Sequence, residues 1–464
     1  MSFINWLLYF LCFFFFFVYL FFKYRKRNYI VSPFNISFFT YSFSMLITPV
    51  FYYVNAAWYP LGIYSASVMY FYLEDAFMVN AVGYIIFLLV LLNKEFNRQI
   101  PVTLIKVSKR VANSISDITI NTFFFLFLLL WHVICIIYCN GYPLLNGNRT
   151  FFVGTSITPV YQFLNLCLLL FTIYFALKHA LYKKKMLFCV LGTITIALQA
   201  NRSPLILSLL IPAFIVHIYS KSKKINNTVY LAKPSFQETK LVFLKNKRII
   251  RKKVKKIFLF CMLMLLLGLL IQSIRKSEEF NIIQLFLEVI IGNTFSDIRD
   301  GAYILSGFKL SESSDYLYGK TYLSALLSFI PSSLSEFRTE WAWGRWTTVT
   351  LFGMSNHFGL RGGNSMEAYI NFGWIGVVVS AFLQAIILSK LEKIFYMIFI
   401  IEKLNINGKE FFVYYILFLL FGVFSATSGM YNVYALICLI VMLTLSSSLI
   451  IRNYPKKLVL NKNR

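Results

Sequence analysis

The chain has 464 residues, of which 59% are hydrophobic, and its mean hydropathy is +0.69. An ordinary soluble enzyme is thereby excluded, because repeated apolar runs of about 18–22 residues are long enough to cross a hydrocarbon core of roughly 30 Å. The net charge of +27 does not indicate a nucleic-acid partner, since the basic residues lie beside the apolar runs, where they set orientation and meet anionic lipid. The sequence predicts an all-α polytopic membrane protein and not a β-barrel.

The clusters of Lys and Arg beside the apolar runs predict which end of each expected span lies inside. About eleven spans, with ten to twelve as the range, put the N-terminus outside and the C-terminus inside. The strongest flank is 221–256, with 13 Lys and Arg against the one acid Glu238. The first run lacks the features of a cleaved signal peptide and is expected to be retained. The expected spans are residues 4–22, 30–54, 76–93, 119–139, 156–177, 186–199, 203–220, 257–274, 366–388, 411–428 and 431–451.

Three regions follow from this order. Residues 1–274 form a membrane bundle of about eight spans, 275–365 form one large outer (periplasmic) loop with short helices, and 366–464 hold the last spans and a basic tail. The acidic pair Glu74-Asp75 is expected in a second outer loop, before the third span. The large loop holds nine of the 18 acidic residues, so the polar chemistry of the protein is expected there.

The positions of the cysteines indicate whether disulfides or a zinc site should be expected. All seven cysteines lie in or at the ends of apolar runs, so neither a disulfide framework nor a zinc site is expected.

The start of the span after the large loop allows two interpretations. Asn364 or Ser365 can cap this span, with Glu367 returning a bond to the cap. Alternatively, the glycines before it leave free N–H groups at a helix N-terminus for a phosphate, with Arg361 as a further ligand.

Other arginines and the tryptophans each allow two interpretations. Arg202, at the tip between two spans, either reaches the lipid headgroups or binds an anion. Arg299 lies next to Asp300 and can simply pair with it. The tryptophans either anchor the loop at the membrane interface or stack on sugar rings. They are Trp341, Trp343 and Trp346.

A family resemblance covers about a fifth of the chain. The residues that carry it are Asn356-His357-Phe-Gly, Gly362-Gly363, Glu367-Ala-Tyr369-Ile-Asn371-Phe-Gly373-Trp-Ile-Gly376 and, more weakly, Phe329-Ile-Pro331-Ser-Ser and Arg202-Ser-Pro204. Together they resemble the motifs of Wzy-type polymerases, which join the oligosaccharide repeat units of O-antigen and capsule. One departure is that such polymerases often have several arginines in the earlier outer loop, where this chain has Arg202 alone.

The resemblance implies a GT-C-like glycosyltransferase on the outer face of the bacterial inner membrane. Its donor would be a glycan on undecaprenyl pyrophosphate and its acceptor a lipid-linked repeat unit, with no metal or cofactor. Membrane lipids, a chain-length regulator and a flippase would be partners. Glu367 or His357 would be the catalytic base. Arginines would bind the pyrophosphate and stabilise its charge, namely Arg202, Arg361, Arg345, Arg299 and Arg338. Further substrate-binding residues would be Tyr369, Asn371, Trp343 and Trp346.

Three other functions remain as alternatives. An O-antigen ligase would use the same donor, and only the string that begins at Glu367 favours a polymerase over it. A flippase or exporter of lipid-linked sugars would have short loops and charges buried in mid-membrane, whereas this chain has a 91-residue loop, 275–365. A lipid-binding assembly protein without catalysis would tolerate the loss of Arg361 and Glu367.

Overall fold

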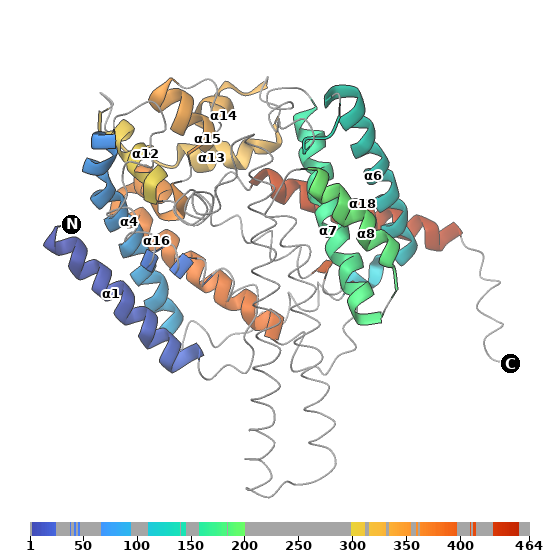
Figure 1. The fold of residues 1–464 in the computed structure, drawn as a ribbon, viewed down its shortest axis with the longest axis horizontal. Coiled ribbons are helices and arrows are strands. Elements are labelled where there is room, and N and C mark those ends of the chain that lie inside the picture. Colours follow the sequence, from blue (N-terminus) through green and yellow to red (C-terminus); the bar gives the residue numbers. More distant parts are fainter. Residues whose placement is uncertain are drawn as a thin grey trace, which may run out of the picture. The chain divides into compact units, whose positions relative to one another are not determined.

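A computed structural model shows a helical chain (Figure 1). It describes residues 2–24, 38, 41–42, 45–46, 66–93, 110–139, 141–144, 157–182, 184–199, 298–310, 315–330, 334–353, 359–360, 362–396, 409, 412–413 and 430–453. Within these ranges there is no β-strand. The helices are α1 (Phe3–Tyr19), η1 (Leu20–Tyr24), α4 (Ala66–Leu92), α6 (Asp117–Cys139), α7 (Thr158–Tyr182), α8 (Met186–Leu198), α12 (Ile298–Leu310), α13 (Lys320–Leu326), η3 (Leu327–Phe329), α14 (Glu336–Trp341), α15 (Trp343–Arg345), η5 (Trp346–Thr350), α16 (Gly363–Tyr396) and α18 (Met430–Asn453).

The long helices have the composition of membrane spans. Five apolar stretches among the described residues are long enough to cross a membrane: Phe3–Phe22, Phe71–Leu92, Asp117–Tyr138, Thr158–His179 and Gly363–Glu392. The predicted spans 4–22, 119–139, 156–177 and 186–199 agree within a few residues with α1, α6, α7 and α8. The chain is therefore a helical membrane protein. The expected spans 203–220 and 257–274, and the basic loop 221–256, lie outside the described residues.

The chain divides into two compact units, each built from separated segments. The first contains residues 1–102, 286–395 and 417–437, and the second contains 103–285, 396–416 and 438–464. The three consecutive regions expected from the sequence were defined by where the chain should cross a membrane, and not by packing. They stay a prediction. The candidate functional site lies in the first unit, which holds α1, α4, α12 to η5, and α16. Residues 298–353 of this unit are called the polar segment below.

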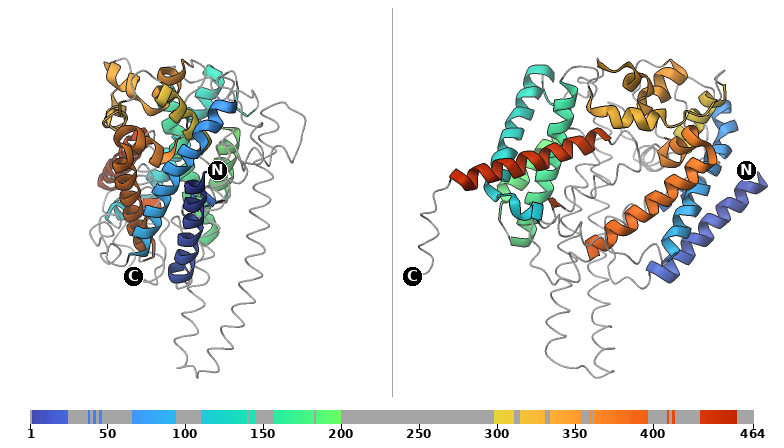
Figure 2. Two further views of the ribbon diagram at one scale, coloured as in Figure 1. Left: turned by 90° about the vertical axis from the view of Figure 1, so that its left-hand side faces the viewer. Right: turned by 180° about the vertical axis from the view of Figure 1, so that it is seen from behind.

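In the first unit, α1 and α4 run parallel and side by side (Figure 2). At one end the Ser2 N–H donates to Glu74 Oε2 at 2.9 Å. Further along, the Cys12 Sγ lies 3.9 Å from the Ala81 carbonyl oxygen. Two parallel neighbours require the chain to return between them.

Two described residues of the predicted span 30–54 contact α1. Tyr9 Oη donates to the Leu46 carbonyl at 2.8 Å, while the ring of Tyr19, later in α1, lies 4.5 Å from the ring of Phe38. The described residues Phe38 and Leu46 therefore follow each other in the direction opposite to α1. That the first three expected spans cross the membrane in alternating directions stays a prediction.

The start of α4 corrects one expectation. The acidic pair Glu74-Asp75 was expected in a loop, but α4 begins at Ala66 and includes both residues. The reason is that both carboxylates have partners at this end of the helix. Glu74 also accepts from Asn5 Nδ2 at 3.0 Å, and Asp75 pairs with Lys309 Nζ of α12 at 2.5 Å. The N-terminal end of α1 and the polar segment are thereby held at the same end of α4.

Small residues bring α12 and α16 against α4. A Cβ at Gly301 would lie 3.0 Å from Met366 Cε and 3.6 Å from Ala76 Cβ, and one at Gly83 would collide with Ser365 Oγ. The helices therefore approach closely where α12, α4 and α16 meet. The resulting core is apolar, and several of its larger side chains are fully buried, among them Tyr84, Tyr303 and Phe77.

Helix α16 differs from the expected span 366–388 at both ends and in the middle. It begins at Gly363, so Asn364 and Ser365, the two expected cap candidates, both lie within its first turn and neither is the cap. Its backbone breaks at Gly373, where φ is 63° and ψ is −149°. Only glycine adopts this combination readily, so the break is set by the sequence.

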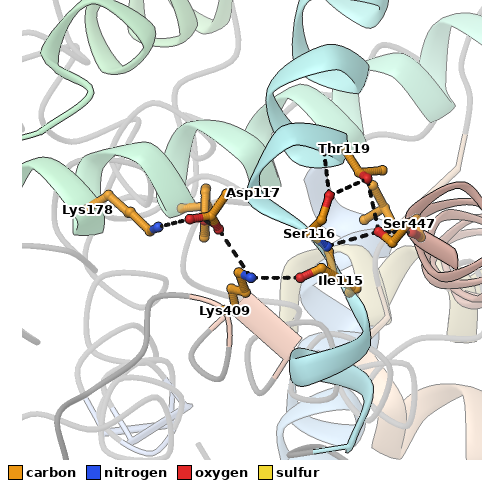
Figure 3. Close-up of polar contacts among 9 residues, drawn as sticks. Ile115, Ser116, Asp117, Thr119, Lys178, Lys409 and Ser447 are labelled. Carbon is orange, nitrogen blue, oxygen red and sulfur yellow. Dashed lines mark hydrogen bonds and ion pairs between the residues drawn. The ribbon is translucent and has the colours of Figure 1, made fainter. Parts of the chain in front are cut away.

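The second unit places α6, α7 and α8 as successive neighbours. At one end the Leu144 N–H donates to the Leu198 carbonyl at 3.0 Å, so the loop after α6 meets the end of α8. At the other end Asp117 pairs with Lys178 at 2.7 Å and with Lys409 at 3.4 Å (Figure 3). Beside this ion pair, Ser447 Oγ accepts from the Ser116 N–H at 2.9 Å and ties α18 to the start of α6.

Candidate functional site

The candidate site is the junction between the polar segment and α16. It begins with a tight turn before α13. Tyr318 and Gly319 both have positive φ, at 47° and 86°, and the Lys320 N–H donates to the Leu317 carbonyl at 3.0 Å. Two consecutive positive φ values define a type I′ turn. The turn directs the chain into α13.

Backbone bonds fasten this turn to the break in α16. The Leu317 N–H donates to the Ile370 carbonyl at 3.1 Å, and the Tyr318 N–H donates to the Asn371 carbonyl at 3.0 Å. The non-helical backbone of Gly373 interrupts the hydrogen-bond ladder just beyond these carbonyls. The break in the helix thus serves to attach the polar segment.

A buried side-chain network reinforces the junction. Asn371 Oδ1 accepts from the Gly319 N–H at 3.0 Å, and its Nδ2 donates to Thr321 Oγ1 and to the Glu367 carbonyl, both at 2.8 Å. Thr321 Oγ1 in turn donates to Glu367 Oε1 at 3.0 Å. Thr321 and Asn371 are fully buried, and Glu367 is 2% exposed. A carboxyl group is thus held in a fixed orientation inside the junction.

Because Glu367 is buried, its negative charge affects the side chains around it. Acidic side chains are almost never fully buried unless they are paired or hydrogen-bonded. Burial raises the pKa of Tyr322, and the negative charge of Glu367 raises it further. The Tyr322 ring stacks on Phe372, with centroids 6.1 Å apart and planes at 9°. A proton acceptor in this position could act on a hydroxyl only if the hydroxyl reached the interior of the junction.

Tyr369 lies on another face of α16, as the helical spacing predicts. Its ring contacts Tyr316 and Trp374, with centroid distances of 6.2 and 5.2 Å. The Tyr316 ring also lies 3.0 Å from where a Cβ of Gly373 would be. Tyr369 therefore packs near the break in the helix, whereas Asn371 belongs to the buried network.

The tryptophans lie mostly inside the first unit. Trp343 and Trp346 stack with ring centroids 5.8 Å apart, and they are 8% and 4% exposed. Trp341 is half-buried, and Lys320 Nζ lies 4.2 Å from its ring centroid. In this arrangement Trp343 and Trp346 stabilise the core, and a role in sugar binding stays a prediction for both.

The described arginines have different surroundings. Arg338 donates from its guanidinium to the Ile330 carbonyl, and burial lowers the pKa of Arg338. Arg299 is bonded to the carboxylate of Asp300, with Nε and Nη2 at 3.1 and 2.9 Å from Oδ1. This is the pairing that their adjacency in the sequence suggested. Arg345 is exposed at the end of α15. Three further candidates, Arg202, His357 and Arg361, lie outside the described residues.

Two members of the junction were not anticipated from the sequence. Thr321 links Asn371 to Glu367, and Gly319 supplies both a backbone donor and a positive φ. The Tyr318-Gly319 dipeptide does indicate a turn. The sequence indicates only weakly that Thr321 belongs to the junction. It is a small polar residue that faces inward in a helix whose leucines face outward.

The fold and this junction define a helical membrane protein in which a folded polar segment is attached to a broken membrane helix. Comparison with known proteins adds nothing to this class, since no family model, curated protein or solved structure matches the chain.

Proposed function

We propose that the chain is a membrane glycosyltransferase that polymerises repeat units carried on undecaprenyl pyrophosphate. The proposal includes a GT-C-like arrangement of about eleven spans in a bacterial inner membrane, with the N-terminus and the polar segment outside. The observation that carries it is that the residues of the polymerase-like string coincide with the junction. Glu367 and Asn371 form its buried network, and Gly373 forms the helix break.

The proposed reaction exchanges one bond to the anomeric carbon for another. An acceptor hydroxyl oxygen attacks the anomeric carbon of the donor glycan, and the bond from this carbon to the pyrophosphate oxygen breaks. The hydroxyl proton passes to a base, Glu367 or His357. The electron pair leaves with the lipid pyrophosphate, whose charge arginines such as Arg345 and Arg361 neutralise.

Glu367 is the stronger candidate for the base because its orientation is fixed. Thr321 Oγ1 donates to one of its carboxylate oxygens at 3.0 Å, and fixed orientation is what a positioned acid or base requires. Because Glu367 is 2% exposed, the proposal requires the junction to open toward the acceptor. We propose that the substrate also contacts Trp343, Trp346, Tyr369 and Asn371.

The test is genetic complementation in the host. A deletion strain is restored with the intact gene, with Glu367→Gln, or with Glu340→Gln as a matched exposed acid of the polar segment. Surface polysaccharide is then separated on a gel. We expect the intact gene and Glu340→Gln to give a ladder, and the deletion and Glu367→Gln to give a single repeat unit, with equal protein levels by immunoblot.

Other patterns would contradict the proposal. Long chains that stay on their lipid carrier in the deletion strain would indicate a ligase. Repeat units that accumulate on the cytoplasmic face would indicate a flippase or exporter. An unchanged ladder in the deletion strain would exclude polysaccharide assembly altogether.

A further inference from the structure

The short helix α13 and the turn η3 have an inverted distribution of polar and apolar side chains. The inward residues are small and polar, and both are fully buried or nearly so. Thr321 bonds Glu367 at 3.0 Å, and Ser324 Oγ donates to the Arg338 carbonyl at 2.9 Å. The outward residues are Leu323, Leu326 and Phe329, which are 49%, 48% and 63% exposed. A helix at a water surface has the opposite pattern.

The inverted face continues onto α16. Tyr322 of α13 stacks on Phe372, and Phe372 is itself 45% exposed. From there an exposed apolar row continues along α16 through Ile375 and Val379, at 75% and 51% exposure. This row belongs to Gly363–Glu392, which is long and apolar enough to cross a membrane.

The other end of the face meets α18. Tyr434 Oη donates to the Leu326 carbonyl at 2.6 Å, and the Phe329 and Tyr434 rings lie 5.4 Å apart in an edge-to-face arrangement. Further along α18, Ile437 is 47% exposed. The outward leucines of α13 therefore lie near apolar side chains of both α16 and α18.

Neighbouring elements of the polar segment have a different surface. The exposed side chains of α14 and α15 include Glu336, Glu340 and Arg345. These are charges that require water. Exposed apolar side chains also occur singly elsewhere in the segment, for example at Leu310 and Leu334, but the face that continues onto α16 is that of α13 and η3.

We propose that α13 and η3 lie within the lipid bilayer at its edge, with Leu323, Leu326 and Phe329 among the acyl chains of the leaflet next to the polar segment. The acyl chains supply the apolar surroundings that the outward residues need, and the inward hydroxyls of Thr321 and Ser324 are bonded inside the protein, as a bilayer requires. The buried Ser328 hydroxyl of η3 has no hydrogen-bond partner among the described residues. The proposal rests on the membrane fold and does not depend on the proposed reaction.

The full-length protein is tested in phosphatidylcholine nanodiscs by hydroxyl-radical footprinting with mass spectrometry. The oxidation of each side chain is compared with its oxidation in the denatured protein. We expect strong protection of Leu323, Leu326 and Phe329. Val349 is the control, because it is 38% exposed and lies four residues after the exposed Arg345. Its oxidation relative to the denatured protein should be clearly higher than that of Leu323, Leu326 and Phe329, although these three are the more exposed in the protein alone.

A second measurement identifies what covers the face. Nanodiscs that contain phosphatidylcholine with a diazirine in its acyl chain are irradiated, and the peptide that carries residues 323–329 should acquire lipid adducts. Oxidation of the three residues comparable to that of Val349 would overturn the proposal, since the face would then be in water. Protection without lipid adducts would also overturn it, and would indicate a covering protein surface such as a second copy of the chain.

Discussion

At the scale of single residues, Thr321 is the link on which the buried network depends. Its hydroxyl accepts from Asn371 Nδ2 and donates to Glu367 Oε1. Sequence analysis identified Glu367 and Asn371, because they belong to a recognisable string. It did not identify Thr321, because the contact joins positions 46 residues apart, and no local pattern specifies such a contact.

We predict that Thr321→Val destabilises the protein by about 1–3 kcal/mol, because it removes one hydrogen bond from each of two buried polar groups, Glu367 and Asn371. Thr321→Ser keeps the hydroxyl and should cost much less. Thermal unfolding of the purified protein in detergent measures both. Equal midpoints for Thr321→Val and the unchanged protein would show that the hydroxyl contributes nothing to the junction.

Tyr322 gives a prediction about alkaline pH. Burial and the nearby Glu367 charge raise its folded-state pKa above the ordinary value of 10.0. The folded protein therefore keeps a proton that the unfolded chain loses, and the stability that Tyr322 contributes is present below pH 10 and declines as pH rises beyond it. We expect Tyr322→Phe to lose less stability than the unchanged protein between pH 9 and 11.

The matched control for Tyr322 is Tyr318→Phe, because Tyr318 is 72% exposed. Unfolding midpoints are compared at each pH. If Tyr322→Phe and the unchanged protein lose stability in parallel above pH 10, the phenol does not titrate differently in the two states.

At the scale of elements, the break in α16 is the feature that joins membrane helix and polar segment. We predict that Gly373→Ala destabilises the protein by about 1–3 kcal/mol, because a side chain is strained at this φ and ψ. The new Cβ would also lie 3.0 Å from the Tyr316 ring. Thermal unfolding in detergent tests this.

Gly344→Ala is the control for the break. A Cβ there would lie 3.6 Å from Gly359 Cα, which is an ordinary contact. It should therefore change the unfolding midpoint little. A Gly373→Ala protein as stable as Gly344→Ala would mean that the helix can straighten without cost.

The elements also show where sequence analysis works. Hydropathy located α1, α6, α7 and α8, because long apolar runs need no knowledge of their neighbours. It started the third span too late, because Glu74 and Asp75 look unsuited to a helix at a membrane edge until their partners Asn5 and Lys309 are known. The helix break at Gly373 was equally hidden, since a glycine within an apolar helix does not by itself indicate a break.

At the scale of the whole molecule, the contacts in the first unit constrain how the chain is threaded through a membrane. Ser2 bonds Glu74, and Lys309 bonds Asp75, the next residue of α4. The start of α1 and the polar segment therefore belong to one side of the membrane. The excess of Lys and Arg predicts the cytoplasmic side for 221–256. With one span, 257–274, expected between the two regions, the sequence predicts the outside for the polar segment.

We predict the sidedness that follows from these two arguments. Ser2→Cys and Asp315→Cys, both at exposed positions, should react with a membrane-impermeant maleimide in spheroplasts, whereas Ser235→Cys should react only after permeabilisation. The native cysteines give the background, measured on the unchanged protein. Labelling of Ser235→Cys alone would mean that the chain is inserted the other way round. Opposite results for Ser2→Cys and Asp315→Cys would contradict the shared attachment of α1 and α12 to α4, and with it the packing of the first unit.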